Sequence, residues 1–393
     1  MAEPIAIAGA GIGGLSAALG LARAGHEIIV LEQAPELGEI GAGIQLGPNA
    51  FHSFDHLGIG DEARAVAVYV DALRMMDATD GAEIARMDTG TAFRARFNNP
   101  YAVVHRGELH TVLQNACRAN ARIDIRTGVH VTGYRTGDRK VDVLMDGGDP
   151  LTVRALIGAD GLRSKVREQM VGDSDLRVSG HATYRTVIPT EKMPPDLRWN
   201  MMTLWAGPKC HLVHYPLKGG ELFNLVVTYH RGMTEPVSGQ PVTNAEVRQG
   251  FEHVCDQALQ IIDFGENWKL WVLCDRDPIR TWTDGTVALL GDAAHPMMQY
   301  LAQGACMAME DAVNLSHHVG RTGDDIEGAL KTYEEQRAAR TARVQQTARL
   351  FGDFVFHPSG ATAHARNTVM RNRTQKEWHD RADWLYARNG LTG

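Results

Sequence analysis

The residues best suited to acid–base chemistry lie in a short run of alternating side chains, Cys210 to Leu217. Successive side chains of a strand point to opposite faces, so His211 and Tyr215 share one face and His214 lies on the other. An imidazole titrates closer to neutral pH than other side chains, which suits it to accept a proton from a weakly acidic hydroxyl. The pattern leaves two candidates for that general base, His211 and His214, because either face could line a pocket.

A predicted hairpin extends the face that carries His211. The dipeptide Gly219-Gly220 separates this strand from a second alternating run and predicts a tight turn. Such a turn pairs His211 with Thr228 and Tyr215 with Asn224. The shared face is then polar at both ends and apolar between them, which suits a small ligand with polar groups at its two ends.

The elements that position these residues begin with a glycine-rich turn near the N-terminus. An apolar run is followed by the spacing G-x-G-x-x-G and then by an Ala/Leu-rich stretch. That spacing permits a tight turn, close approach of a pyrophosphate and close packing of helix on strand. A carboxylate ends the next strand 18 residues after the last of these glycines, where it can accept hydrogen bonds from a ribose. The predicted adenine dinucleotide site consists of Gly9, Gly11, Gly13, Gly14 and Glu32.

Three further polar residues lie where predicted strands give way to turns or helices. Arg106 begins a helix, Asp160 follows a buried strand, and Asp292 follows the strand Val287 to Leu290. Ligands bind at the carboxyl ends of strands in open α/β sheets, which favours Asp292 as a binding residue rather than only a helix cap. Arg106 could instead be a surface charge, and Asp160 could instead support its turn and cap the next helix.

A helix is predicted to begin near Gly304, after the loop Pro296 to Gln303. The positive end of its dipole, at Gly304 and Ala305, would stabilise negative charge on a bound ligand.

The composition is that of an ordinary globular chain, with 393 residues, 44% hydrophobic residues and a net charge of -7. The length predicts at least two domains, and the negative charge argues against a nucleic-acid partner. We expect neither a membrane span nor a signal peptide, because the apolar runs are short and the N-terminus lacks a basic flank and cleavage site. The five cysteines include no C-x-x-C pair, which argues against a metal site and favours a reducing, cytoplasmic location.

The pattern of elements predicts an α/β protein. Residues 1–174 and 281–393 are interpreted as the two parts of a Rossmann-type nucleotide-binding domain, the second ending in a C-terminal helical segment. Residues 175–280 form an inserted, mostly antiparallel β domain for substrate binding. Residues 38–49 contain too many glycines for regular structure to be expected.

These separated motifs resemble those of the FAD-dependent aromatic hydroxylases, the group A flavoprotein monooxygenases of the p-hydroxybenzoate hydroxylase class. The resemblance covers essentially the whole chain and implies non-covalent FAD. It implies that Asp292 contacts the ribityl chain and pyrophosphate, that Arg106 reaches the phosphates, and that Asp160 serves FAD and nicotinamide binding. The helix at Gly304 would face the flavin and stabilise its reduced, anionic form.

Within this family, Cys210 to Glu221 and Pro296 to Ala305 look like the corresponding segments of 3-hydroxybenzoate 6-hydroxylases. Asp383-Trp384-Leu385-Tyr386 fits the same group. This resemblance implies that His211, Tyr215 and Gln299 line the substrate pocket. In catalysis we expect His211 to act as the base and Gln299 to donate a hydrogen bond to the same phenolic oxygen.

The substrate pocket is expected to be lined by further polar residues. The family pattern places Tyr215 there, and Asn224 is its expected cross-strand partner. Gln45 is a candidate for holding a carboxylate, as are Tyr215 and backbone N–H groups. Tyr101 could line the pocket or could be a core aromatic residue.

The resemblance implies that FAD, NAD(P)H and O₂ hydroxylate 3-hydroxybenzoate para to its hydroxyl, giving 2,5-dihydroxybenzoate (gentisate). NADH is favoured over NADPH, and a homodimer is compatible with the family. Salicylate 1-hydroxylases and 6-hydroxynicotinate 3-monooxygenases remain alternatives, although Gln299-Tyr300 stands where the pyridine enzymes usually have Pro-His. A dehydrogenase that does not activate oxygen and a non-catalytic Rossmann-type binding protein are the alternatives from other classes.

Overall fold

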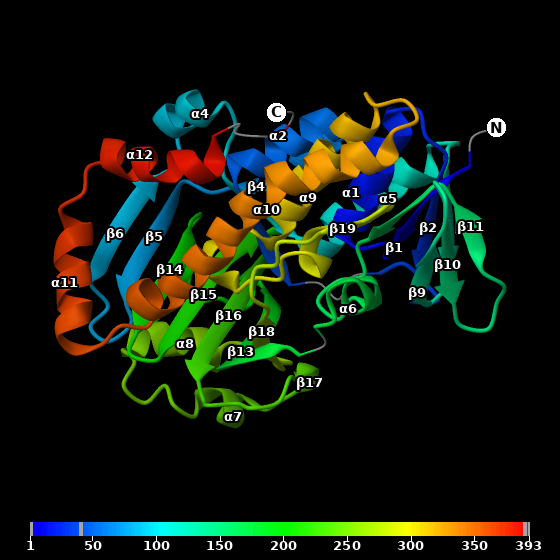
Figure 1. Ribbon diagram of the computed structural model, residues 1–393. Helices are drawn as coiled ribbons and strands as arrows, with labels where there is room; N and C mark the ends of the chain where they lie inside the picture. The colour runs from blue at the N-terminus through cyan, green and yellow to red at the C-terminus, as the bar shows by residue number, and fades with distance from the viewer. Residues whose placement is uncertain (1–2, 39–41, 174, 388–390, 392–393) are drawn as a thin grey trace.

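The glycine-rich turn lies in a six-stranded sheet of the computed structural model, which describes residues 3–38, 42–173, 175–387 and 391 (Figure 1). The strand order is β19-β20-β12-β1-β2-β8, and all neighbours are parallel except β19 and β20. Most of its central strands are continuously apolar because helices cover the sheet. The strands are β1 (Ile5–Ala8), β2 (Ile28–Glu32), β8 (Ile123–Thr127), β12 (Ala155–Gly158), β19 (Thr283–Asp284) and β20 (Val287–Leu289).

Helices from both ends of the chain pack on this sheet. Helix α1 packs against α5 and α9, and α10 contacts α9, β19 and β20. Their starts at Ile12, Arg106 and Gly304 agree with the predicted positions. These helices are α1 (Ile12–Arg23), α5 (Arg106–Arg118), α9 (Gly304–Val319) and α10 (Ile326–Phe351).

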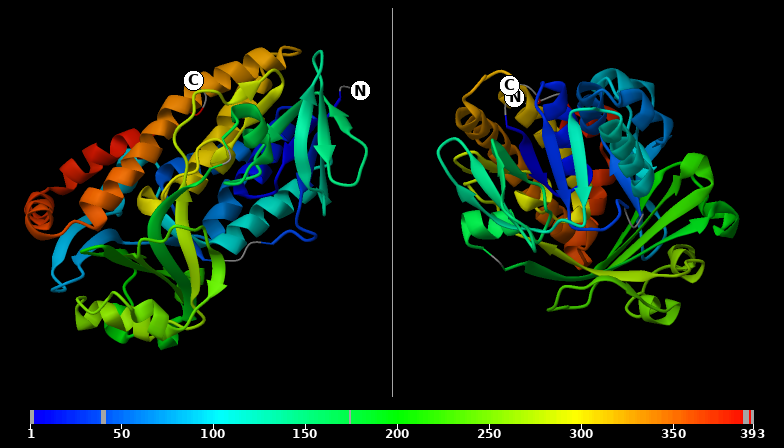
Figure 2. Two further views of the ribbon diagram at one scale, coloured as in Figure 1. Left: turned by 60° about the horizontal axis from the view of Figure 1, so that its bottom comes forward. Right: turned by 90° about the vertical axis from the view of Figure 1, so that its right-hand side faces the viewer.

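An eight-stranded sheet forms the second layer, in which most strands are green and β5 and β6 are blue in Figure 1; Figure 2 shows the sheet from two other sides. Its order is β17-β18-β13-β16-β15-β14-β5-β6, and only β14 and β5 are parallel. This arrangement confirms the predicted mostly antiparallel sheet. The strands are β5 (Ala72–Asp77), β6 (Glu83–Asp88), β13 (Arg177–Pro189), β14 (Met202–Gly207), β15 (Cys210–Leu217), β16 (Leu222–His230), β17 (Ser238–Pro241) and β18 (Lys269–Asp275).

Two segments differ from expectation. The hairpin β5–β6 comes from the N-terminal part of the chain, outside residues 175–280, and pairs with β14. Without that pairing β14 would expose an open sheet edge. Residues 43–46, expected to be irregular, form strand β3, because Gly43 to Leu46 pair with His105 to Ala102 of β7.

The remaining elements connect or cover the two large sheets. Helices α11 and α12, in red, lie beside β5 and β6 (Figure 1). The other strands are β3 (Gly43–Leu46), β4 (Val68–Tyr69), β7 (Ala102–His105), β9 (Val131–Thr136), β10 (Val141–Met145) and β11 (Leu151–Val153). The other helices are α2 (Pro48–Leu57), α3 (Gly60–Ala65), α4 (Thr91–Phe97), α6 (Lys165–Val171), α7 (Asn244–Arg248), α8 (Asp256–Asp263), α11 (Gly360–Arg371) and α12 (Gln375–Tyr386), with short 3₁₀ or π turns between them.

Candidate active site

A cavity of about 580 Å³ lies between the six-stranded and eight-stranded sheets. It extends from the glycine-rich turn, past the start of α9, to the face of the second sheet. This volume is typical of a ligand pocket.

The glycine turn has the geometry that a pyrophosphate needs. Gly9 has a φ of +100°, and a Cβ there would lie 2.5 Å from the carbonyl oxygen of Ala159. A Cβ on Gly14 would lie 1.9 Å from the carbonyl oxygen of Gly9, so this glycine allows α1 to pack on β1. A Cβ on Gly11 would meet nothing within 4 Å. Gly11 and Gly13 line the cavity where α1 begins without a side-chain cap, so the turn leaves room and N–H donors for a dinucleotide.

Glu32 lies beside this turn at the end of β2. Its carboxylate accepts hydrogen bonds from the backbone N–H groups of Ala10 (2.8 Å) and Ala34 (2.9 Å). The acid is thereby fixed next to the glycine turn, as expected of a residue that binds the ribose of an adenine dinucleotide.

Four further residues predicted to bind the cofactor come from two parts of the chain that are far apart in the sequence. Arg106, Asp292, Gly304 and Ala305 all line the cavity. A Cβ on Gly304 would lie 3.8 Å from Oδ1 of Asp292, so Asp292 lies next to the start of α9. Helix α9 begins here without a side-chain cap, and the positive end of its dipole faces the cavity.

Asp160 does not line the cavity, although its neighbours Ala159 and Gly161 do. Its carboxylate accepts hydrogen bonds from the Ser164 hydroxyl and from the N–H groups of Lys165 (2.7 Å) and Val166 (3.3 Å). Burial raises the pKa of this carboxyl group, while these hydrogen bonds lower it. The structure therefore shows Asp160 supporting its turn and capping α6, the alternative reading of the sequence.

The second sheet forms the floor of the cavity. His211 pairs with Thr228, and Tyr215 pairs with Asn224, as the hairpin predicts. The connection spans residues 218–221 rather than two residues, but the register is the same. His211, Val213 and Tyr215 line the cavity.

His214 lies on the opposite face, in a separate core. Its Nδ1 accepts a hydrogen bond from Nε1 of Trp205 at 3.3 Å. Burial lowers the pKa of His214 to about 3. Of the two candidate bases, only His211 faces the cavity.

His211 is almost fully buried and is held by a second histidine. Its Nδ1 lies 2.7 Å from Nε2 of His357, and the two rings are stacked. Burial, followed by the neighbouring His357 and His181, holds the pKa of His211 well below 6.5. The imidazole is therefore neutral at neutral pH and can accept a proton, and Nε2 is the nitrogen not engaged by His357.

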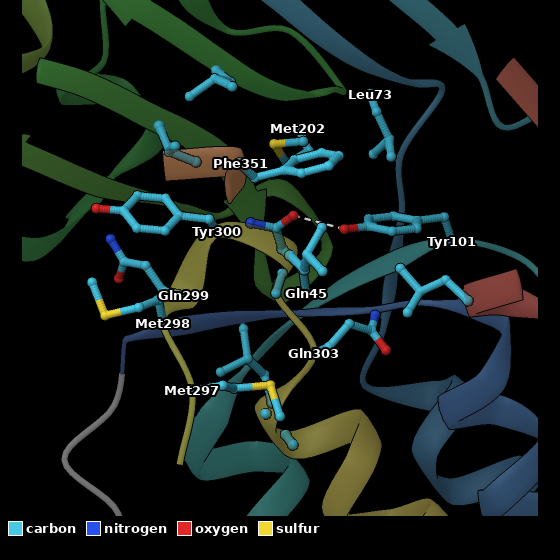
Figure 3. Close-up of a pocket in the computed structure, with 18 of the residues that line it drawn as sticks. Gln45, Leu73, Tyr101, Met202, Met297, Met298, Gln299, Tyr300, Gln303 and Phe351 are labelled. Carbon is cyan, nitrogen blue, oxygen red and sulfur yellow. Dashed lines mark hydrogen bonds between the residues drawn. The ribbon is translucent and has the colours of Figure 1, made fainter. Parts of the chain in front are cut away.

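Gln299 has a fixed amide orientation. Its Oε1 accepts a hydrogen bond from Nη2 of Arg185 at 2.7 Å, and its Nε2 donates to Oγ1 of Thr228 at 3.3 Å. Because Thr228 is the cross-strand partner of His211, the amide donor lies near the imidazole. Figure 3 shows Gln299 and Tyr300 on one side of the cavity and Tyr101 on the other.

The other predicted substrate residues divide into two groups. Tyr101 lines the cavity and donates a hydrogen bond to Oε1 of Gln45 at 2.7 Å, drawn dashed in Figure 3. Tyr101 is also a buried core residue, so both readings of it hold. Asn224 is not part of the lining. Its Oδ1 accepts a hydrogen bond from the N–H of Gly43 at 2.7 Å and so attaches β3 to the sheet.

Sequence reasoning missed two residues of the site. Arg185 of β13 pairs with Val226 and lines the cavity, so the eight-stranded sheet supplies an arginine to the site. Burial lowers the pKa of this guanidinium, and no partner within the described chain satisfies its buried Nε. His357 follows a π-helical turn, Gly352–Phe356, whose position had no clear sequence signal.

Among the described residues, no group of three or more His, Cys, Asp or Glu side chains is arranged to hold a metal ion. No helix in the same part of the chain has the length and apolar character needed to cross a membrane.

Proteins similar to this chain in sequence or structure include FAD-binding proteins and hydroxylases. Residues 3–348 match the family model described as an FAD binding domain. The chain is 53% identical over 388 residues to 3-hydroxybenzoate 6-hydroxylase 1 of Aquipseudomonas alcaligenes, covering 99% of this chain and 98% of that protein. It is 47% identical over 386 residues to 3-hydroxybenzoate 6-hydroxylase of Polaromonas naphthalenivorans, covering 98% and 96%. The structure of Klebsiella pneumoniae HpxO complexed with FAD and uric acid matches with a TM-score of 0.87 at 26% identity, covering 98% of each chain.

Proposed function

Because the chain belongs to the FAD-dependent aromatic hydroxylases, we propose that it hydroxylates 3-hydroxybenzoate para to the hydroxyl group, giving 2,5-dihydroxybenzoate. The names of the similar proteins support this substrate, and one structural observation carries the chemistry. A neutral imidazole, His211, and an oriented amide donor, Gln299, adjoin the same threonine at the floor of the cavity.

The cavity fits FAD at the end nearest the glycine turn. Gly11, Gly13 and Arg106, which line the cavity, would bind the pyrophosphate, and Asp292 would bind the ribityl chain. Glu32, which is held beside the glycine turn, would bind the adenosine ribose. The N-terminus of α9 would stabilise negative charge on the reduced flavin. Bound FAD, reduced by NAD(P)H, supplies the activation of O₂ and the transfer of one oxygen atom to the ring.

The protein's own part is to activate the ring. A phenol has a pKa near 10, like tyrosine, and is protonated at neutral pH, whereas its phenolate is a far stronger electron donor. His211 accepts the phenolic proton at Nε2, while Gln299 donates a hydrogen bond to the resulting oxyanion. Their placement on one sheet fixes the ring before oxygen is transferred.

The carboxylate is held by Arg185. Arg185, Val226 and Val213 lie side by side on three neighbouring strands. This row of side chains is two residues, or about 6.6 Å, along the strands from the row that contains His211. The guanidinium matches a carboxylate in shape and charge. Tyr215, one further row along, bounds the substrate at that end, and Val213 and Val226 contact the ring.

The test is oxidation of NAD(P)H stimulated by a panel of hydroxybenzoates and hydroxynicotinates, with identification of products. We expect 3-hydroxybenzoate to give 2,5-dihydroxybenzoate, with NADH preferred to NADPH. Conversion of salicylate to catechol with release of carbon dioxide, and no turnover of 3-hydroxybenzoate, would contradict the proposal. Hydroxylation confined to 6-hydroxynicotinate would contradict it equally.

A further inference from the structure

A second, polar cavity of about 350 Å³ lies behind the floor of the active site. Met298 and Tyr300 line both cavities and form part of the wall between them. His357 lines the second cavity, and His211 lines the first.

These two histidines connect the cavities through one hydrogen bond. Nδ1 of His211 lies 2.7 Å from Nε2 of His357, and the ring centroids are 5.0 Å apart. The π-helical turn Gly352–Phe356 places Phe356 in the wall of the first cavity and His357 against His211. Single π turns are frequent at functional sites.

A base in the position of His211 has to dispose of the proton that it accepts. Burial and the adjacent histidines disfavour a charged ring there, so the pKa of His211 lies well below 6.5. Burial, followed by the neighbouring His181 and His230, lowers the pKa of His357 to about 3. A proton that stopped on either ring would create an unfavourable buried charge, whereas one that passed through both rings would leave them neutral.

We propose that His357 relays the substrate's phenolic proton from His211 to solvent in the second cavity. The phenolic O–H bond breaks, and its proton joins Nε2 of His211 as the Nδ1 proton of His211 moves to Nε2 of His357. His357 releases its own Nδ1 proton to water. Both imidazoles remain neutral with exchanged tautomers, and the negative charge resides on the phenolate. The reverse transfer, when product is protonated, restores the starting tautomers.

The groups around His357 favour release of the proton rather than its storage. Its ring faces His181 of β13, which is hydrogen-bonded to the Tyr300 hydroxyl and lies edge-on to His230. Arg177 and Arg349 approach from β13 and α10, and each is paired with Asp275 at 2.7 Å. The charged and titratable groups of the second cavity are Arg177, His181, Lys209, His230, Tyr300, Arg349 and Asp353. The three cations oppose accumulation of protons, and exposed Asp353 is the carboxylate on the side of solvent.

The test rests on the proposed function and follows proton release without turnover. FAD-loaded protein is mixed rapidly with 3-hydroxybenzoate in weak buffer containing a pH indicator and no NAD(P)H, and binding is followed separately by the flavin absorbance. The parent should release a proton on binding. His357→Gln keeps an acceptor for Nδ1 of His211 but cannot relay, so release should slow by about 10²-fold, the lower end of the range for general acid–base catalysis. Rising pH should restore the rate.

Chemical rescue separates relay from support of the fold. Added imidazole should speed release in His357→Ala, because the second cavity can admit it. His364→Gln, on the exposed side of α11, should match the parent. The relay alone would be overturned if His357→Gln released the proton at the parental rate. It would also be overturned if release were slowed but neither imidazole nor higher pH restored it. If the parent fails to bind 3-hydroxybenzoate, the proposed function fails and the relay with it.

Discussion

At the scale of single residues, the site depends on an imidazole that burial keeps neutral. Burial disfavours the protonated form of His211. His211 therefore accepts a proton only when a phenol contacts it and a proton can pass on to His357. An exposed histidine would be partly protonated at neutral pH, and the protonated fraction would be unable to accept the phenolic proton.

Replacing His211 with alanine should lower hydroxylation by roughly 10²–10⁴-fold, the range for losing a general base. FAD should stay bound, because the glycine turn and α9 are untouched, and residual NAD(P)H oxidation should yield hydrogen peroxide. The measurement is the ratio of hydroxylated product to NAD(P)H consumed. His214→Gln, on the other face of the same strand, is the matched control and should stay within a few-fold of the parent. Coupled turnover of His211→Ala at a parental rate would remove this residue from the mechanism.

Replacing Arg185 with leucine should weaken recognition of the substrate's carboxylate. Loss of a hydrogen bond to a charged group costs about 1.5–3 kcal/mol, so KM should rise roughly 10- to 100-fold. The comparison is kcat/KM for 3-hydroxybenzoate against that for the neutral amide 3-hydroxybenzamide. The parent should prefer the acid, and the variant should lose this preference while Arg185→Lys keeps part of it. An unchanged preference would show that another group holds the carboxylate.

At the scale of elements, local signals were readable from the sequence and long-range pairings were not. The register of β15 on β16 could be predicted from a short turn centred on Gly219-Gly220, because the expected two-residue turn and the observed four-residue connection give the same pairs for His211 and Tyr215. Strand β13 pairs with β16 across a long stretch of chain, so nothing local fixes its register and Arg185 was missed. Asn224 was placed on the correct face but is covered by β3, which the glycine content of that segment concealed.

Substitutions at two glycines of the first turn should affect FAD binding and protein stability separately. Gly11→Val should lose FAD with little effect on the stability of the flavin-free protein, because its side chain would enter the space expected for the pyrophosphate. Gly14→Val should destabilise the protein itself, because its Cβ would overlap the carbonyl oxygen of Gly9. Flavin absorbance after gel filtration measures retention, and chemical unfolding of the flavin-free proteins measures stability. Equal loss of stability in both variants would contradict this division.

At the scale of the whole molecule, buried histidines make folding sensitive to acid. Burial lowers the pKa of His181 to about 4 and those of His214 and His357 to about 3, and His211 shifts in the same direction. An unfolded chain binds these protons near pH 6.5, so it holds more protons than the folded chain below that pH. Stability should therefore be complete above about pH 6.5 and be lost as the pH falls toward 3–4.

Within this pH window, each such histidine adds up to about 1.4 kcal/mol per pH unit to the slope of the free energy of unfolding against pH. Urea unfolding at a series of pH values should show the free energy of unfolding falling as acid is added. His214→Gln removes one of these groups away from the active site and should flatten the slope by about that amount. A variant with the parental pH dependence would show that His214 is not held neutral by the fold.

The order of the central sheet governs when the protein can first hold its cofactor during synthesis. Strand β1 leaves the ribosome almost at once, but β20, Asp292 and the start of α9 are made only after the whole second sheet. A nascent or truncated chain that ends before Gly304 therefore lacks one wall of the cavity. Since a ligand stabilises only the folded form that binds it, FAD stabilises completed chains and leaves incomplete ones exposed to proteolysis. Added FAD should therefore protect the full-length chain against limited proteolysis, but not a chain truncated before Gly304.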